Sequence, residues 1–259
     1  MVACLNLKKT GLVPVFLLWL FYLTACSPSL EQQLDHLKLS VATTQLLLVT
    51  TTDWETSTAT LQRMEKSADH WQAVGESVPV RVGRNGLGWG VGLHQDGDVV
   101  QKQEGDGKAP AGVFPLGMVF GYADQVPVGL QMPYRIASDR DYFIDAVDSP
   151  DYNRWRSIPL DQANEPKQYW RSFERMRRDD HQYELGMMVG HNLFPTTAGR
   201  GSAIFLHVWL NPDTATSGCT AMSKADLLSI LTWLKPTANP LLIQVPVDQV
   251  ADLRFPEAQ

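Results

Sequence analysis

Cysteine is scarce in this chain of 259 residues, which contains only three. Cys4 and Cys26 lie near the N-terminus, so the rest of the chain has a single thiol, Cys219. A framework of disulfides is therefore excluded for the main part of the protein. A lone cysteine indicates either a reactive thiol or a buried apolar side chain, and its surroundings must decide between the two.

Excess positive charge is also absent. The chain has 22 lysines and arginines against 28 acidic residues, for a net charge of −6, and no basic stripe that would favour nucleic acid as a partner. Internal repeats and low-complexity tracts are missing too. Charged residues make up 19% of a chain rich in glycine, proline and tryptophan, which indicates a compact, loop-rich globule rather than a disordered protein.

The N-terminal apolar run is too short to span a bilayer comfortably. It covers twelve residues, 11–22, and follows Lys8 and Lys9, as in a signal peptide. The run ends in Leu-Thr-Ala-Cys at 23–26, which resembles the lipobox of bacterial lipoproteins. That resemblance implies cleavage before Cys26 and lipid on its sulfur; an uncleaved anchor and a plain secretory signal are the alternatives. Ser27, in place of aspartate, resembles lipoproteins of the outer membrane, on the periplasmic side of the envelope.

The chain is accordingly divided into a signal peptide (1–25), a polar tether (26–44), a folded domain (45–250) and a tail (251–259). Alternating and continuous apolar runs in the domain predict a mainly β fold. One of these runs, 58–66, also fits a helical period, but the short spacings on both sides favour a strand in a meander. The predicted strands are 45–51, 58–66, 70–74, 78–83, 113–120, 202–206 and 241–246.

The stretch from 201 to 222 contains the strongest chemical signal. A short apolar strand ends at His207, and a turn leads to Thr-Ser-Gly-Cys at 216–219. Ser223, with Asp226 three residues later, predicts the start of a helix over 224–234. A histidine at a strand end and a cysteine twelve residues later can come within hydrogen-bond reach, as a Cys-His nucleophile pair requires.

These positions define the candidate catalytic residues. We expect Cys219 to be the nucleophile and His207 its base. The predicted helix directly after Cys219 should lower the pKa of the thiol. Backbone N–H groups at Ser217, Gly218 and Cys219 are candidate oxyanion donors. Secondary candidates are Thr216 and His191, although a lone histidine is more often structural.

A second segment, Gly-Asp-Gly-Lys-Ala-Pro-Ala-Gly-Val-Phe at 105–114, precedes this stretch. Together the two motifs resemble the YkuD-like L,D-transpeptidases, which join peptidoglycan stems through a catalytic cysteine. The resemblance covers residues 45–246 and implies a mixed-sheet sandwich or open barrel with a few helices. It also implies a tetrapeptide stem as donor, release of D-alanine, an amine as acceptor, acylation by carbapenems, and no cofactor or metal.

Two departures from the family pattern limit which site residues can be inferred from the resemblance. Many members have a second histidine where this chain has Ser217, and an arginine where it has Ala221. The turn from His207 to Cys219 is also shorter than usual. Groups that grip the substrate must therefore come from elsewhere. An L,D-carboxypeptidase that uses the same cysteine, and a wall-binding lipoprotein without catalysis, remain as alternative functions.

The middle of the chain, 134–188, is the least regular part. Its acidic residues are spaced too loosely for a calcium loop, so no metal is expected there. Tyr169, Trp170 and Phe173 predict an amphipathic helix near 168–178, which would pack against the sheet or form a lid over the cleft. The oligomeric state cannot be inferred from these patterns.

Overall fold

The computed structural model describes residues 28–95, 97, 100–162 and 165–256. The predicted signal peptide and the lipidation site Cys26 lie outside these residues. Within the described part, no helix is long and apolar enough to cross a membrane.

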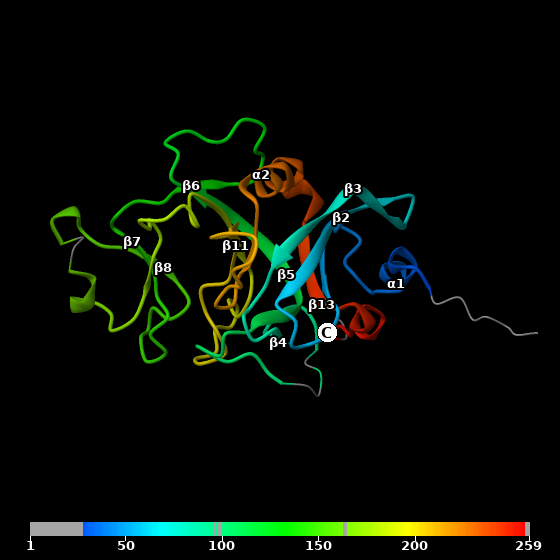
Figure 1. Cartoon of the computed structure of the whole chain (residues 1–259), viewed down its shortest axis with the longest axis horizontal. Helices are drawn as coiled ribbons and strands as arrows, with labels where there is room; N and C mark the ends of the chain where they lie inside the picture. The colour runs from blue at the N-terminus through cyan, green and yellow to red at the C-terminus, as the bar shows by residue number, and fades with distance from the viewer. Residues whose placement is uncertain (1–27, 96, 98–99, 163–164, 257–259) are drawn as a thin grey trace, which may run out of the picture.

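The main sheet has ten strands, and eight of them form a closed ring (Figure 1). Going round the ring, the order is β10-β11-β12-β3-β2-β1-β13-β5, and β5 pairs with β10 to close it. Two pairs in the ring, β1–β13 and β11–β12, are parallel and the other six are antiparallel, so the sheet is mixed. The bounds are β1 Gln45–Thr51, β2 Thr58–Ser67, β3 His70–Arg81, β5 Ala109–Gly121, β10 Leu185–Val189, β11 Phe205–Val208, β12 Thr220–Met222 and β13 Leu241–Pro246.

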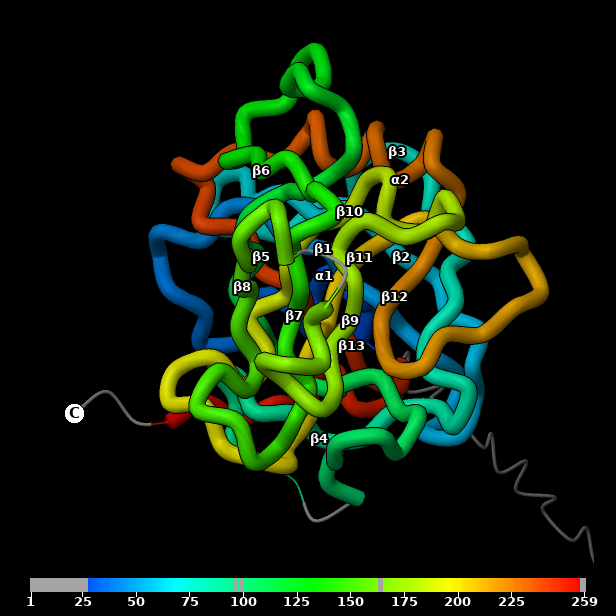
Figure 2. Tube along the Cα trace, turned by 90° about the vertical axis from the view of Figure 1, so that its left-hand side faces the viewer, coloured from blue at the N-terminus to red at the C-terminus, as the bar shows by residue number. Residues whose placement is uncertain are grey.

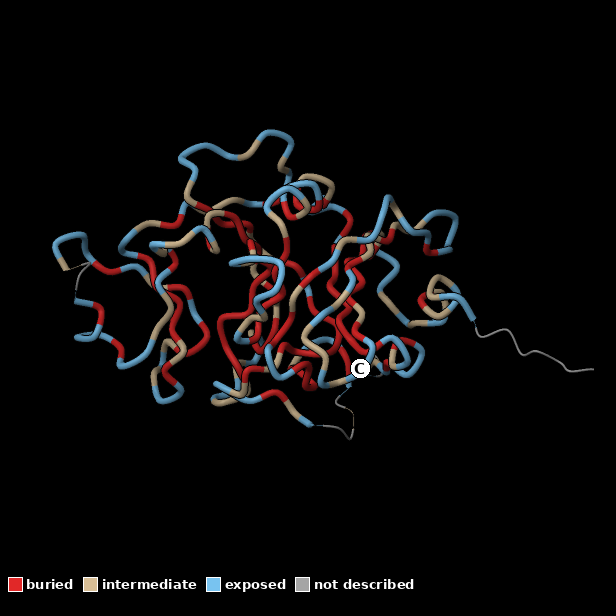
Figure 3. The backbone as a smooth tube through the Cα atoms, in the orientation of Figure 1, coloured by how far each residue is buried: buried red, intermediate tan, exposed pale blue. Residues whose placement is uncertain are grey.

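The prediction of a mainly β, mixed-sheet domain is confirmed, and the predicted 45–51 and 241–246 coincide with β1 and β13. Both strands are buried along nearly their whole length, which explains their continuous apolar runs (Figure 3). The predicted 58–66 is strand β2. The predicted strands 70–74 and 78–83 are one long strand, β3, which has a shift of register where it pairs with β2.

Two short strands extend the main sheet beside β5: β4 (Leu87–Trp89) and β6 (Tyr134–Ile136). A second, three-stranded sheet consists of β7 (Asp141–Phe143), β8 (Trp155–Ser157) and β9 (Glu174–Arg175). This small sheet lies at the end of the molecule opposite the N-terminal helix, and it faces the viewer in Figure 2. Short 3₁₀ turns occur at Leu160–Gln162, Pro166–Gln168, Pro236–Ala238 and Val247–Asp252.

The helix predicted near 168–178 is wrong. Glu174 and Arg175 pair with β7 as strand β9, so their backbone groups are satisfied by a neighbouring strand. The aromatic side chains that suggested a helical face pack on Tyr142 instead: its ring centroid lies 6.0 Å from that of Trp170 and 5.1 Å from that of Phe173. Pairing with β7, a strand distant in the sequence, therefore outweighed the helical spacing of the aromatic residues.

The predicted helix at 224–234 is confirmed as α2 (Lys224–Trp233). Ser223 caps it, since the Ser223 hydroxyl accepts a hydrogen bond from the Asp226 N–H group. Leu227, Ile230 and Leu231 form its buried face. However, α2 does not follow Cys219 directly, because strand β12 lies between them.

Part of the segment predicted as a tether packs on the domain. Helix α1 (Leu30–Asp35) starts with a capping box between Ser29 and Gln32, and Leu34 is fully buried. The Asp35 carboxylate accepts hydrogen bonds from the Trp71 N–H group at 2.7 Å and contacts the His70 ring at 2.8 Å. Residues 30–35 therefore belong to the folded body, while the division of the chain into its other parts stays a prediction.

We predict that Leu34→Ala lowers the free energy of unfolding by about 2–4 kcal/mol, because it removes buried apolar contacts and leaves a cavity. Urea denaturation measures this change. Val41→Ala is the matched control: Val41 is 89% exposed, so its loss should change stability by less than about 0.5 kcal/mol. Equal stabilities for the two variants would mean that α1 is not docked in solution.

Candidate active site

A polar cavity of about 440 Å³ lies between the barrel and the small sheet, and both Cys219 and His207 line it. Its other walls come from segments far apart in the sequence. The loop before β5 supplies Lys102 and Glu104, the small sheet supplies Glu174, and the loop before β12 supplies Ser217. The structure thus brings together the two residues that the sequence singled out for catalysis.

Strand pairing explains why His207 and Cys219 share a cavity. β11 and β12 run parallel and side by side, with Leu206 opposite Thr220 and His207 opposite Ala221. Cys219 immediately precedes β12, so its sulfur reaches the backbone of β11. The Phe205 N–H group points at the Cys219 sulfur at 3.4 Å.

The Cys219 thiol is buried and neutral. It is 7% exposed, donates a hydrogen bond to the Ala203 carbonyl at 3.3 Å, and packs in a cluster that includes Phe120, Phe143 and Tyr183. Burial, and then the nearby Glu174, raise the pKa of the Cys219 thiol to about 12. The expectation of a thiol acidified by a helix N-terminus is therefore wrong, because a strand rather than a helix follows it.

His207 is also buried, and its proton is placed by the backbone. Its Nδ1 atom lies 2.8 Å from the Val208 carbonyl oxygen, which can only accept, so Nδ1 donates and the lone pair is on Nε2. Burial lowers the pKa of His207 to about 4, although the bond to Val208 opposes this shift. Among the described residues, no hydrogen bond joins His207 to Cys219, so the pair rests as neutral imidazole and neutral thiol.

Side chains brace the turn before Cys219. The Thr216 hydroxyl accepts from the Gly218 N–H group at 3.1 Å and donates to the Cys219 carbonyl at 2.6 Å. Thr216 therefore shapes the turn, and the Gly218 N–H group is directed at Thr216. Ser217 accepts a hydrogen bond from the Arg84 guanidinium at 3.1 Å.

The glycine-rich segment 105–114 supports this turn from behind. A Cβ added at Gly218 would lie 3.0 Å from the Lys108 carbonyl oxygen, so the two backbones are in close contact. A Cβ at Gly83 would lie 2.5 Å from the Gly107 carbonyl oxygen, which shows an equally close approach on the other side. The segment is thus held between the cysteine turn and the loop at 83–86, and both of its neighbours need glycine where it passes.

Comparison with known proteins agrees with this geometry. Residues 62–247 match the family model YkuD, described as an L,D-transpeptidase catalytic domain. The chain belongs to this family. No curated protein matches the chain. Among solved structures, this YkuD domain is similar to one titled "Structure of Bdellovibrio bacteriovorus Bd1075", with a TM-score of 0.38 and 10% sequence identity. That alignment covers 83% of this chain and 54% of the other, so this chain spans about half the length of the structure it matches.

The two departures from the family pattern occupy different environments in this YkuD domain. Ser217 lines the cavity, in contact with Arg84. Ala221 is 1% exposed and lies opposite Arg81 of β3, inside the sheet. The side chain of Arg81 is engaged outside the cavity, where it donates to the Pro212 carbonyl and lies 3.6 Å from Asp213.

Sequence reasoning missed the charged residues of the cavity. Glu104 accepts from the hydroxyls of Tyr152 at 2.6 Å and Ser202 at 2.7 Å, and Glu174 accepts from the Tyr183 hydroxyl. Burial raises the pKa of Glu174. No local sequence signal marks Glu174, because it reaches the cavity through segments distant in the sequence. For Glu104 the one available signal is its position next to the 105–114 motif.

His191, the secondary histidine candidate, has a structural role. It is 1% exposed, its Nδ1 atom accepts from the Val91 N–H group at 3.2 Å, and its Nε2 atom lies 2.9 Å from the Arg200 carbonyl. Burial lowers its pKa to about 3. Both ring nitrogens are therefore used by the backbone, and His191 does not line the cavity.

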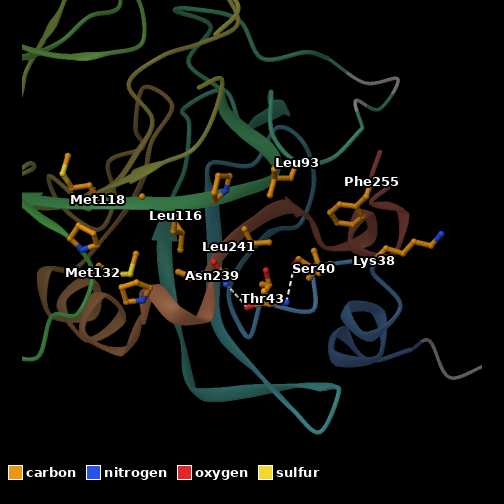
Figure 4. A pocket seen from close by; sticks show the side chains of 17 residues that line it. Lys38, Ser40, Thr43, Leu93, Leu116, Met118, Met132, Asn239, Leu241 and Phe255 are labelled. Atoms are coloured by element: carbon orange, nitrogen blue, oxygen red, sulfur yellow. Dashed lines mark hydrogen bonds between the residues drawn. The ribbon is translucent and has the colours of Figure 1, made fainter. Parts of the chain in front are cut away.

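A larger cavity of about 650 Å³ lies elsewhere and contains none of the predicted site residues (Figure 4). Its walls are mostly apolar, with Leu93, Leu116, Met132 and Phe255 among them, and Lys38 at the edge. In the described part of the chain, no three His, Cys, Asp or Glu side chains are grouped so that they could hold a metal ion.

We predict that Cys219 reacts slowly with iodoacetamide at neutral pH. Only the thiolate reacts, and a pKa near 12 leaves roughly a thousandth of the thiolate that an ordinary cysteine has. The rate should still rise about tenfold per pH unit up to pH 9, as followed by intact mass. Glu174→Gln should speed alkylation wherever Glu174 is ionised, because its charge disfavours the thiolate. A rate that levels off below pH 8 would contradict the raised pKa.

Proposed function

We propose that this YkuD domain is a peptidoglycan L,D-transpeptidase in which Cys219 forms an acyl-enzyme. The observation that carries the proposal is that Cys219, the one thiol of the described residues, shares a cavity with a histidine whose tautomer the backbone fixes. Membership of the family supports peptidoglycan as the substrate class. The donor would be a tetrapeptide stem, attacked at the bond between its diamino acid and the terminal D-alanine.

The neutral pair suits a concerted proton transfer. As the Cys219 sulfur attacks the carbonyl carbon, its proton passes to the Nε2 atom of His207, whose Nδ1–H stays bonded to Val208. The imidazolium then gives the proton to the departing D-alanine amine, and a thioester remains on Cys219. With the Gly218 N–H group directed at Thr216, the Cys219 N–H group is the candidate donor to the oxyanion.

The acceptor decides between two reactions at this site. An amine of another stem or of an envelope protein gives transpeptidation, while water gives L,D-carboxypeptidase activity. Incubation with purified tetrapeptide stems separates them, because transpeptidation yields a cross-linked dimer together with D-alanine. D-alanine without a dimer would assign the domain to hydrolysis.

A wall-binding protein without catalysis is the second candidate, and the burial of Cys219 favours it. A thiol that is 7% exposed among aromatic rings behaves as a small apolar side chain unless the cavity admits a substrate. In that case Cys219→Ala would leave the cellular phenotype unchanged.

We also propose that the domain works in the cell envelope, on the periplasmic side. The lipobox-like sequence at 23–26 supports a lipid anchor on Cys26, in the outer membrane. Globomycin, an inhibitor of lipoprotein signal cleavage, should then cause a larger precursor to accumulate, and Cys26→Ala should abolish labelling by a fatty-acid analogue.

The decisive prediction concerns acylation by a carbapenem. Intact-mass spectrometry should show one adduct on the wild type and none on Cys219→Ser, because only the thiol at 219 can form the thioester. His207→Gln should form the adduct about 10²–10⁴ times more slowly, since it removes the base. An adduct on the wild type and on Cys219→Ser alike would point to another nucleophile.

The pH profile gives a separate prediction. His207 must be neutral to accept a proton, and its pKa of about 4 keeps it neutral at every pH well above 4. The acid limb of kcat/KM for the stem should therefore lie near pH 4, below the value near 6.5 of an ordinary histidine. An acid limb at pH 6–7 would show that His207 is more exposed to solvent in the working enzyme, or that another group is the base.

A further inference from the structure

Arg84 lines the cavity and has no acidic partner among the described residues. Three basic side chains line the cavity: Arg84, Lys102 and Arg178. Lys102 bonds to Asp106 at 2.5 Å, and Arg178 bonds to Asp180 at 2.8–3.1 Å. Among the described residues, no acidic side chain pairs with Arg84. It is exposed, and its bond goes to the neutral hydroxyl of Ser217.

The backbone holds Arg84 beside the cysteine turn. Its N–H group donates to the Thr216 carbonyl at 2.8 Å, and the Thr216 N–H group donates to the Val82 carbonyl at 3.0 Å. Gly83 and Thr216 form a parallel bridge. The loop that contains Arg84 is therefore paired, backbone to backbone, with the turn that contains Cys219. This pairing fixes the position of one segment against the other.

Gly107 makes room for the guanidinium. A Cβ at Gly107 would lie 2.8 Å from the Arg84 Cζ atom, and Gly107 has a φ of +71°, which favours glycine. The Asn85 N–H group bonds to the Gly107 carbonyl at 3.0 Å, so this approach is fixed. The guanidinium thus lies beside the cysteine turn, without an acidic partner in the described part of the chain, where a ligand could bind it.

We propose that Arg84 binds the terminal carboxylate of the acyl donor, a specificity role that rests on the proposed function. Ser217, its contact, precedes Cys219 by two residues, so the Cα atoms of 217 and 219 are at most about 7 Å apart and the guanidinium is bonded close to the nucleophile. In a stem that ends in D-alanine, the attacked carbonyl and the terminal carboxylate are one residue apart, which matches this spacing. A guanidinium binds a carboxylate through two parallel hydrogen bonds.

The carboxylates that line the cavity argue for this direction of binding. Glu104 and Glu174 accept hydrogen bonds from Tyr152 and Tyr183, and a negative charge on either carboxylate would repel an anion. A carboxylate entering the cavity is therefore directed toward the Ser217 side, where Arg84 lies. An amino group of the same substrate would be favoured at the acidic wall.

The experiment compares two tetrapeptide stems, one with a free C-terminal carboxylate and one with a C-terminal amide. Calorimetric binding to the Cys219→Ala protein should favour the acid at least tenfold, which corresponds to a charge-assisted hydrogen bond of about 1.5–3 kcal/mol. Arg84→Ala in that background should bind both peptides equally, and Arg84→Lys should restore part of the preference. Arg140→Ala, which removes an exposed arginine that does not line the cavity, should keep the full preference.

The outcomes separate this proposal from the proposed function. If Arg84→Ala retains the preference for the acid, or if the parent shows none, the assignment of Arg84 is wrong. If the preference depends on Arg84 but protein with Cys219 intact neither cross-links nor hydrolyses the stem, Arg84 is supported as a carboxylate-binding residue and the reaction is wrong. With turnover, Arg84→Ala should raise KM for the acid at least tenfold and change kcat far less.

Discussion

The parallel pairing of β11 with β12 is the constraint on which the site depends. Parallel neighbours must be joined by a crossover, and here the crossover is the short turn from Trp209 to Cys219. The end of this turn places Cys219 immediately before β12, beside β11, which contains His207. Closure of the barrel through β5 and β10 then holds β11 in place, because β10 is its other neighbour. A change that loosened β11 would separate the imidazole from the thiol.

Burial sets the protonation state of this pair. Desolvation disfavours every charged form, so it raises the pKa of Cys219 and lowers that of His207, and an ion pair is not the resting state. Such a site keeps the thiol unreactive toward small electrophiles in water. Under the proposed function, a substrate that fills the cavity and brings a carbonyl to the sulfur is attacked as the thiol proton passes to His207, which lines the same cavity. Reactivity would then depend on binding rather than on a permanently ionised cysteine.

Local sequence patterns predicted the elements whose burial in the structure follows the spacing of apolar residues in the sequence. The continuous apolar runs of β1 and β13 and the Ser223 cap of α2 are examples, and the motif residues Cys219 and His207 share a cavity as expected. Prediction failed where distant segments decide. Glu174 and Arg175 form a strand only because β7 is beside them, and Leu34 is buried only because β3 passes over it. The carboxylates of the cavity were missed for the same reason. Glu104 and Glu174 come from separate segments, so no spacing between nearby residues shows that they line one cavity.

The glycine-rich motif illustrates what a sequence pattern can conceal. Read alone, residues 105–114 indicate a turn into a strand, and that strand is β5. In the structure the same residues also contact two loops, one with Arg84 and one with Cys219, and a Cβ at Gly83 would lie only 2.5 Å from the Gly107 carbonyl oxygen. The guanidinium of Arg84 lies in the space that a Cβ at 107 would enter, so the motif and Arg84 are in contact. Gly107 has a φ of +71°, so the turn itself favours glycine at this position, and the Arg84 side chain lies next to it.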